Sequence, residues 1–302
     1  ISSENTFTIP IKGLKNPSFM ISSFLKTKFK KNQDIVHAHN IPAALAMKNT
    51  SGKKILSLHG VFSQQIDQLH GKTTGSISKK YEQNALTWAD AITVISKEAF
   101  DYYSNLGFNV HQIPNGIDFS VIHLQENRKF EKQVIFAGRL SKEKGIKTLI
   151  EICKQLPSEI HLLIIGDGPE KENIKKIELE NTNIHYLGTK NHKETVSLIK
   201  GSDVLIQPSF SEGISSTILE AMACKTTVIA SNIGGNPELI QDEKSGILIE
   251  PTNHEIFCKK IIKLMSDESL RDKLSSLAYE TVKKYDWKII GKQYIELYNS
   301  LL

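Results

Sequence analysis

Short apolar runs alternate along the chain with amphipathic stretches of helical period. Most of these runs are apolar at successive positions, which is typical of parallel strands covered by helices on both faces. The alternation therefore predicts an α/β fold of strand–helix units. The expected strands are residues 34–39, 53–59, 91–96, 110–114, 133–138, 161–166, 183–188, 203–208, 226–231 and 246–250.

One polar stretch without a clean period interrupts this pattern and precedes a fresh strand. We expect residues 121–132 to form an interdomain linker after a first domain of residues 1–120. Each half then reads as its own doubly wound parallel sheet. Ligands of such sheets bind beyond the carboxyl ends of the strands, near the point where the strand order reverses.

Charge is distributed unevenly over the 302 residues, whose net charge is +5. Residues 1–125 hold 13 Lys and Arg against 8 Asp and Glu, so they carry the whole excess. The densest cluster is Lys26, Lys28, Lys30 and Lys31, which fits anionic lipid or an acidic acceptor, or else a solvated helix face. Nucleic acid is not expected as a partner, because no aromatic residues are interleaved with the cations and no nucleic-acid motif occurs.

The rest of the composition argues for a reducing, cytoplasmic setting. Three scattered cysteines do not make a disulfide framework or a zinc site. No apolar run approaches the ~20 residues that span a bilayer, and no secretory signal opens the chain. Peripheral contact with the inner face of the membrane stays open because of the basic first half.

Two acidic residues stand out around a predicted strand end. Glu212 lies in a small-residue loop after the strand at 203–208, and Glu220 follows in a helix expected to begin at Ser216 or Thr217. Backbone N–H groups at a helix N-terminus attract a diphosphate, and a nearby carboxylate can accept hydrogen bonds from sugar or ribose hydroxyls. Alternatively, Thr217 and Glu220 form a capping box and Glu212 is a solvated loop residue.

Other candidates also follow strand ends. Arg139 and Lys144 flank the turn after residues 133–138, where a planar fork and a point charge suit a diphosphate. They could equally be surface cations. Gly166 opens a Gly-Asp-Gly-Pro turn, and His59 ends the strand at 53–59, where it is either a sugar contact or a satisfied structural histidine.

Four short sequence motifs together resemble those of a known family. EGISSTILEAMA (212–223), GRLSKEKG (138–145), GDGP (166–169) and GGNPE (234–238) are similar to motifs of the family four retaining glycosyltransferases, the group 1 type. The resemblance covers the chain from about residue 34 onward. It implies the GT-B fold, in which two Rossmann-like doubly wound parallel sheets face each other across a cleft.

The resemblance also implies that the two domains bind different substrates. Residues 1–120 would form the acceptor-side domain and residues 133–284 the nucleotide-sugar domain, with a last helix, 285–302, crossing back to the first. The implied reaction is retaining transfer, of hexosyltransferase type, from a UDP- or GDP-sugar to an unnamed acceptor. No Asp-x-Asp occurs, so we expect neither a metal nor another cofactor.

Site residues follow from the matched motifs. Arg139 and Lys144 would hold the diphosphate, Glu212 and His59 would contact the transferred sugar, and Glu220 would bind the ribose. The expected catalytic residues are thus Arg139, Lys144, Glu212 and His59. The expected donor-binding residues are Glu220, Gly138, Gly213, Ile214, Ser215, Gly166, Thr189 and Lys190, the last two beside the nucleobase.

The resemblance departs from the family at the front. Nothing in residues 1–33 looks like the family's first strand and Gly-rich loop, and the sequence opens with Ile1. We therefore expect a chain without that segment, which puts acceptor binding and activity in question. Two alternatives remain, an inactive or non-catalytic nucleotide-sugar binding protein and a nucleotide-sugar epimerase of the same fold.

Overall fold

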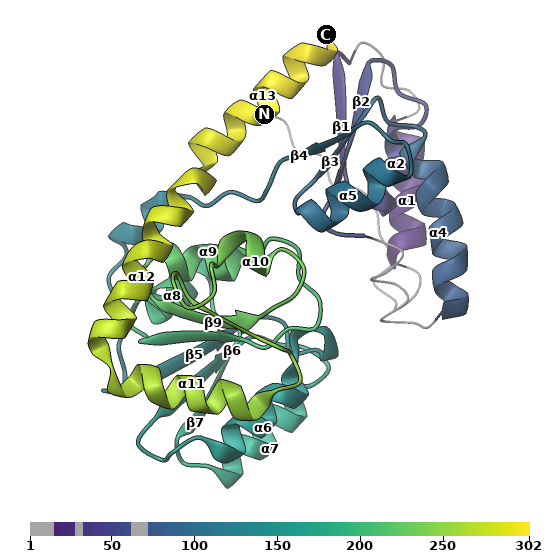
Figure 1. Cartoon of the computed structure of the whole chain (residues 1–302). Coiled ribbons are helices and arrows are strands. Elements are labelled where there is room, and N and C mark those ends of the chain that lie inside the picture. The colour runs from purple at the N-terminus through teal and green to yellow at the C-terminus, as the bar shows by residue number, and fades with distance from the viewer. Residues whose placement is uncertain (1–14, 28–32, 62–71) are drawn as a thin grey trace. The chain divides into compact units, whose positions relative to one another are not determined.

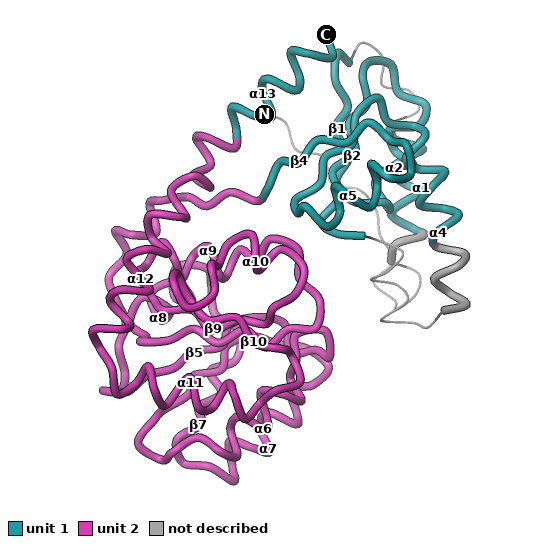
Figure 2. Tube along the Cα trace, viewed as in Figure 1, with its two compact units in different colours: residues 1–114, 291–302 teal, residues 115–290 magenta. Residues whose placement is uncertain are grey.

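The chain forms two compact units, which Figure 1 draws as a ribbon and Figure 2 colours separately. The computed structural model describes residues 15–27, 33–61 and 72–302. Unit 1 comprises residues 1–114 and 291–302, and unit 2 comprises residues 115–290. The expected absence of the family's first strand and Gly-rich loop concerns residues 1–33, and most of these lie outside the described residues.

Unit 1 is built on a four-stranded sheet in the order β1-β2-β3-β4, and every pairing in it is parallel. Its strands are β1 (Ile35–His39), β2 (Lys53–Leu58), β3 (Ala91–Val94) and β4 (Val110–Gln112). All four residues of β3 are buried, and Ile92 and Val94 share one hydrophobic cluster with helical residues of this unit. The predicted strands of the first half are confirmed.

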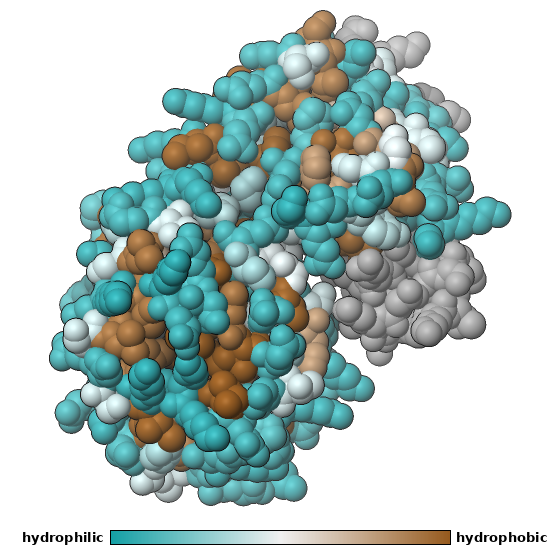
Figure 3. All heavy atoms as spheres, viewed as in Figure 1, coloured by the Kyte–Doolittle hydropathy of each residue, from teal (hydrophilic) through white to brown (hydrophobic). Residues whose placement is uncertain are grey.

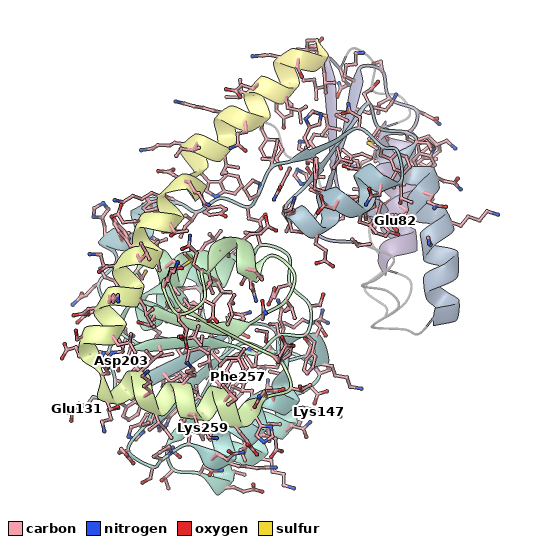
Figure 4. All side chains as sticks on the ribbon, in the orientation of Figure 1. Glu82, Glu131, Lys147, Asp203, Phe257 and Lys259 are labelled. Atoms are coloured by element: carbon pink, nitrogen blue, oxygen red, sulfur yellow. The ribbon has the colours of Figure 1, made fainter. Side chains whose placement is uncertain are left out.

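Within the described ranges, some helices of unit 1 pack on the sheet and others pack on a neighbouring helix. They are α1 (Lys15–Thr27), α2 (Ile41–Met47), α4 (Lys72–Leu86), α5 (Lys97–Asn105) and the C-terminal part of α13 (Trp287–Leu301). Met47 and Tyr103 are fully buried in the core. The Tyr103 hydroxyl donates a hydrogen bond to the buried carboxylate of Glu82, which Figure 4 labels on α4.

Unit 2 holds a six-stranded parallel sheet in the order β10-β9-β8-β5-β6-β7. The order reverses between β5 and β8, as in a Rossmann fold. The strands are β5 (Gln133–Ala137), β6 (His161–Ile165), β7 (Ile184–Gly188), β8 (Val204–Gln207), β9 (Thr227–Ser231) and β10 (Ile247–Ile249). Each confirms a predicted strand, and two units with parallel sheets confirm the expected α/β, GT-B fold.

Helices sandwich the sheet of unit 2 (Figure 1). On one side α6 packs against α7 and α11, and on the other α9 packs against α8 and α12. Their bounds are α6 (Ile146–Gln155), α7 (Lys171–Glu180), α8 (His192–Lys200), α9 (Ser216–Ala223), α11 (His254–Ser266) and α12 (Glu268–Val282), and the short helices are η1 (Phe119–His123), η2 (Lys142–Lys144), η3 (Lys283–Tyr285) and α10 (Asn236–Leu239).

The division between the units falls at residues 114 and 115, ahead of the linker expected at 121–132. That stretch is held on unit 2 by hydrogen bonds. The Lys200 ammonium donates to the backbone oxygens of Ile122 and Leu124, at 2.8 Å each. Arg128 pairs with Asp203, which Figure 4 labels, at 2.8 Å. A polar, aperiodic sequence therefore marks an irregular segment that is bonded to one unit.

The surface mixes hydrophilic and hydrophobic side chains. On the face drawn in Figure 3, hydrophilic side chains dominate and hydrophobic atoms gather in smaller patches. Within the described ranges, no helix is both long enough and apolar enough to cross a bilayer.

Candidate functional site

The carboxyl edge of the sheet in unit 2 gathers most of the predicted site residues. The loops after β5 and β8 lie side by side there, because these two strands are neighbours at the point where the strand order reverses. In open α/β sheets, ligands bind beyond the carboxyl ends of the strands at such a reversal point. Arg139 and Lys144 come from the first loop, and Glu212 comes from the second.

Lys144 and Glu212 form an ion pair across these two loops. The Lys144 Nζ atom lies 2.7 Å from Glu212 Oε1, and the side chains are 25% and 6% exposed. The same oxygen accepts hydrogen bonds from Gln207 Nε2 at 2.8 Å and from Ser209 Oγ at 2.7 Å. Three donors on one oxygen fix the carboxylate, and none of the described residues donates to Oε2. The pair thus presents one cation and one oriented acceptor.

Glycines allow the two loops to come this close. Gly145 has a left-handed φ of 71°, and a Cβ placed on it would lie 1.8 Å from the carbonyl oxygen of Pro208. A Cβ on Gly234 would lie 1.9 Å from the carbonyl oxygen of Glu212, and one on Gly235 would lie 2.5 Å from that of Gly213. The Gly-Gly turn after β9 therefore supports the backbone under Glu212.

A second close approach orders the loop that carries Arg139. A Cβ on Gly166 would lie 1.8 Å from the carbonyl oxygen of Gly138, so the turn after β6 packs directly on the loop after β5. Gly138 itself has room, since its added Cβ would meet only the Phe136 ring at 3.6 Å. Arg139 is 68% exposed and lies 4.0 Å from Glu143. Its guanidinium is accessible to an anion.

Glu220 lies in α9 and bonds to a residue that the sequence did not single out. Its carboxylate is 14% exposed, and Oε1 lies 2.8 Å from Nε2 of His192, the first residue of α8. Burial raises the pKa of Glu220. The expected helix start at Ser216 is confirmed, but the alternative capping box of Thr217 with Glu220 is wrong. Ser215 is the N-cap, and its hydroxyl accepts from the backbone N–H of Ile218.

The remaining donor-binding candidates have mixed surroundings. Ile214 is buried, and its backbone oxygen accepts a hydrogen bond from Asn115 Nδ2 at 2.8 Å. Ser215 is also buried, so its side chain serves the helix. Thr189 is exposed and Lys190 is half-buried just after β7. The bond from His192 to Glu220 ties this loop to α9.

His59 belongs to unit 1, at the end of β2, where it joins a row of histidines. Its ring stacks on His39 with centroids 6.2 Å apart, and His39 stacks on His37 at 4.4 Å. His37 is held by Tyr298 of α13 at 2.8 Å and by Ser57 at 2.6 Å. Burial, and then the charge of His39, lower the pKa of His59, and the same causes lower that of His37 to about 4. The contact of His59 with a donor sugar stays a prediction.

Sequence reasoning missed Gln207, Ser209 and His192. Gln207 ends a strand of otherwise apolar residues, which is a usable signal, since a buried polar side chain needs a partner. Asn191 and Glu194 form the capping box that starts α8, so the helix start was readable, but the contact of His192 was not. In the described ranges, no group of three or more His, Cys, Asp or Glu residues could hold a metal ion. Metal independence stays a prediction.

Comparison with known proteins agrees with this geometry. Residues 122–281 match the family described as Glycosyl transferases group 1, and residues 5–121 match Glycosyltransferase Family 4. An uncharacterized glycosyltransferase of Methanocaldococcus jannaschii is 27% identical over 297 residues, covering 92% of this chain and 71% of the relative.

Two solved structures share the fold. The sucrose-phosphate synthase of Thermosynechococcus elongatus superposes with a TM-score of 0.84 at 21% identity, covering 97% of this chain and 80% of that one. The Anabaena protein HepE in complex with UDP-glucose gives 0.78 at 19% identity, covering 94% and 82%. With a family match over more than half of its residues, the chain belongs to the glycosyl transferases of group 1.

Proposed function

We propose that this glycosyltransferase moves a hexose from a nucleoside-diphosphate sugar to a hydroxyl acceptor with retention of anomeric configuration. The observation that carries the proposal is the Lys144–Glu212 pair at the reversal point of the sheet, with the accessible Arg139 on the same loop as Lys144. HepE, which shares the fold, was solved with UDP and with UDP-glucose, and this supports the donor class.

Binding follows from the charges along the carboxyl edge. Arg139 and Lys144 take the diphosphate, because a guanidinium fork and an ammonium together neutralise its charge. Gly138 and Gly166 let the backbone approach it closely. Glu220 accepts hydrogen bonds from the ribose hydroxyls. Thr189 and Lys190 border the nucleobase, and Gly213, Ile214 and Ser215 shape the loop around the sugar.

The chemical step needs charge stabilisation more than a protein nucleophile. As the bond from C1 to the β-phosphate oxygen breaks, negative charge grows on the diphosphate, where Arg139 and Lys144 stabilise it. The acceptor oxygen bonds to C1 on the same face, and its proton passes to the leaving diphosphate. Glu212 holds the sugar through a hydroxyl, and the family resemblance assigns a further sugar contact to His59. This step uses no metal ion.

The test is turnover of UDP-, GDP- and ADP-sugars, with release of the nucleoside diphosphate measured and the sugar product followed by NMR. We expect one donor to be turned over and the α-anomer to appear first from an α-linked donor. Early appearance of the β-anomer would refute retention. Release of no nucleotide, with a new epimer of the donor, would favour the epimerase instead, and binding without turnover would favour a non-catalytic role.

The acceptor side of the proposal rests on unit 1. The basic excess of residues 1–125, together with Ile21 and Leu25 exposed one turn apart on α1, supports peripheral contact with anionic lipid on the cytoplasmic side of a membrane. Three free cysteines fit that reducing compartment. Vesicle flotation with and without phosphatidylglycerol tests the contact. Equal binding to neutral and anionic vesicles would contradict it.

A further inference from the structure

His192 holds a fixed place although its side chain is 63% exposed. It is the first residue of α8, directly after the N-cap Asn191. The Asn191 side chain accepts from the Glu194 N–H at 2.9 Å, and the Glu194 carboxylate accepts from the Asn191 N–H at 3.2 Å. Both bonds fix the backbone beside His192, so the Cα atom that carries the imidazole is held in place.

The imidazole bonds to one oxygen of a buried carboxylate. A carboxylate only accepts hydrogen bonds, so Nε2 of His192 is the donor to Glu220 Oε1 at 2.8 Å. No other described residue donates to this carboxylate. The bond occupies Oε1 and sets the plane of the carboxylate, which leaves Oε2 for a ligand. Without the hydrogen bond from His192, the ligand itself would have to order the Glu220 side chain, which has three rotatable bonds.

We propose that His192 is a positioning residue that orients the Glu220 carboxylate toward the ribose of the donor, so that the enzyme prefers ribose over deoxyribose nucleotides. The inference rests on the proposed function, because it takes Glu220 as the ribose ligand. Burial of Glu220, which raises its pKa, is consistent with a carboxylate that needs a fixed donor. His192 itself also links the loop after β7 to α9, on the nucleobase side of the proposed site.

The experiment is calorimetric titration of the full chain with UDP, GDP and ADP, followed by the 2′-deoxy and 3′-deoxy forms of the one that binds. His192→Ala should weaken binding of the ribonucleotide about 3- to 10-fold, the size of one hydrogen bond. It should leave at least one deoxy form unaffected. His192→Gln, whose amide can replace the Nε2–H, should restore most of the loss. His123→Ala, at an exposed histidine of η1, is the control.

A double-mutant cycle decides whether His192 acts through Glu220. In the Glu220→Ala background, His192→Ala should cause no further loss. Additive losses, equal losses for ribo and deoxy forms, or no rescue by His192→Gln would overturn the inference while leaving the donor site intact. If the folded wild-type chain binds none of the three nucleotides, the proposed function fails, and this inference fails with it.

Discussion

Removing the positive charge of Lys144 should cost stability and activity by different routes. Opposite charges 2.7 Å apart attract by roughly 6 kcal/mol at an effective dielectric of about 20, much of which desolvation offsets. Stripping the partner from a buried charge costs about 3–5 kcal/mol. Glu212 keeps its bonds from Gln207 and Ser209, so we expect Lys144→Met to cost about 2–3 kcal/mol.

The reverse change should be milder. Glu212→Gln leaves a lysine that is a quarter exposed and can turn toward water, so its cost should stay near 1 kcal/mol. The double variant Lys144→Met/Glu212→Gln buries no charge and should recover to within about 1 kcal/mol of wild type. All three variants should lose turnover at least about 100-fold, because the diphosphate loses its cation or the sugar loses its carboxylate.

Urea unfolding can isolate unit 2. The chain has two tryptophans, Trp88 in unit 1 and Trp287 in unit 2, so a Trp88→Phe background leaves fluorescence that reports the second unit. The midpoint should fall most for Lys144→Met and recover in the double variant, with an unchanged slope. A Lys144→Met chain as stable as Glu212→Gln, or a double variant as unstable as Lys144→Met, would show that Glu212 is not left as an uncompensated buried charge.

Four further predictions use other features. Gly145 and Gly188 both have a left-handed φ, so an alanine at either position costs about 1–2 kcal/mol. Only Gly145→Ala also places its Cβ 1.8 Å from the carbonyl oxygen of Pro208, so this variant should melt at the lower temperature. Equal melting temperatures would contradict this. Glu220→Gln should be more stable than wild type at pH 7. Burial raises the pKa of the Glu220 carboxyl in the folded chain, so its ionisation costs stability once the pH exceeds the pKa that this group has in the unfolded chain. The gain in stability should vanish in acid. The pKa of His37 is lowered to about 4 in the folded chain, whereas the unfolded chain protonates this histidine below about pH 6.5. Stability should therefore fall from pH 6.5 toward pH 4, and His37→Gln should flatten that fall. An unchanged melting profile would count against this. Turnover should survive EDTA, and a loss reversed by Mg²⁺ or Mn²⁺ would contradict the metal-free step.

The strands were readable from the sequence because most of them are buried on both faces, although β1, β4 and β7, at the sheet edges, are only partly buried. Runs such as VIFA at 134–137 are apolar at successive positions, and the flanking Gly and polar residues mark their ends within two residues. The strand-order reversal between β5 and β8 then follows from the two-sided winding that such units favour. Arg139, Lys144 and Glu212 could be placed at one edge for the same reason.

Contacts between side chains from distant segments were not readable. The bond of His192 to Glu220 joins residues 28 apart, and neither position carries a local signal of the other. Thr217 and Glu220 have the spacing of a capping box, but Ser215 is the N-cap, so the helix begins two residues earlier than that box requires. The sequence of residues 121–132 predicts a linker, yet this segment is bonded to the rest of unit 2. Lys200 donates to the backbone oxygen of Ile122, and Arg128 donates to Asp203. Hydrogen bonds between distant segments decided the first and last cases, and the local bond of Ser215 decided the second.

We expect the carboxyl edge of unit 2 to bind a nucleoside diphosphate through the loop after β5. The most direct measurement is calorimetric titration of UDP, GDP and ADP into wild type, Arg139→Ala and Lys259→Ala, an exposed cation of α11 that Figure 4 labels. We predict that one nucleotide binds wild type and Lys259→Ala equally and binds Arg139→Ala at least about 10-fold more weakly. Equal affinity for all three proteins, or no binding by the folded wild type, would contradict the claim.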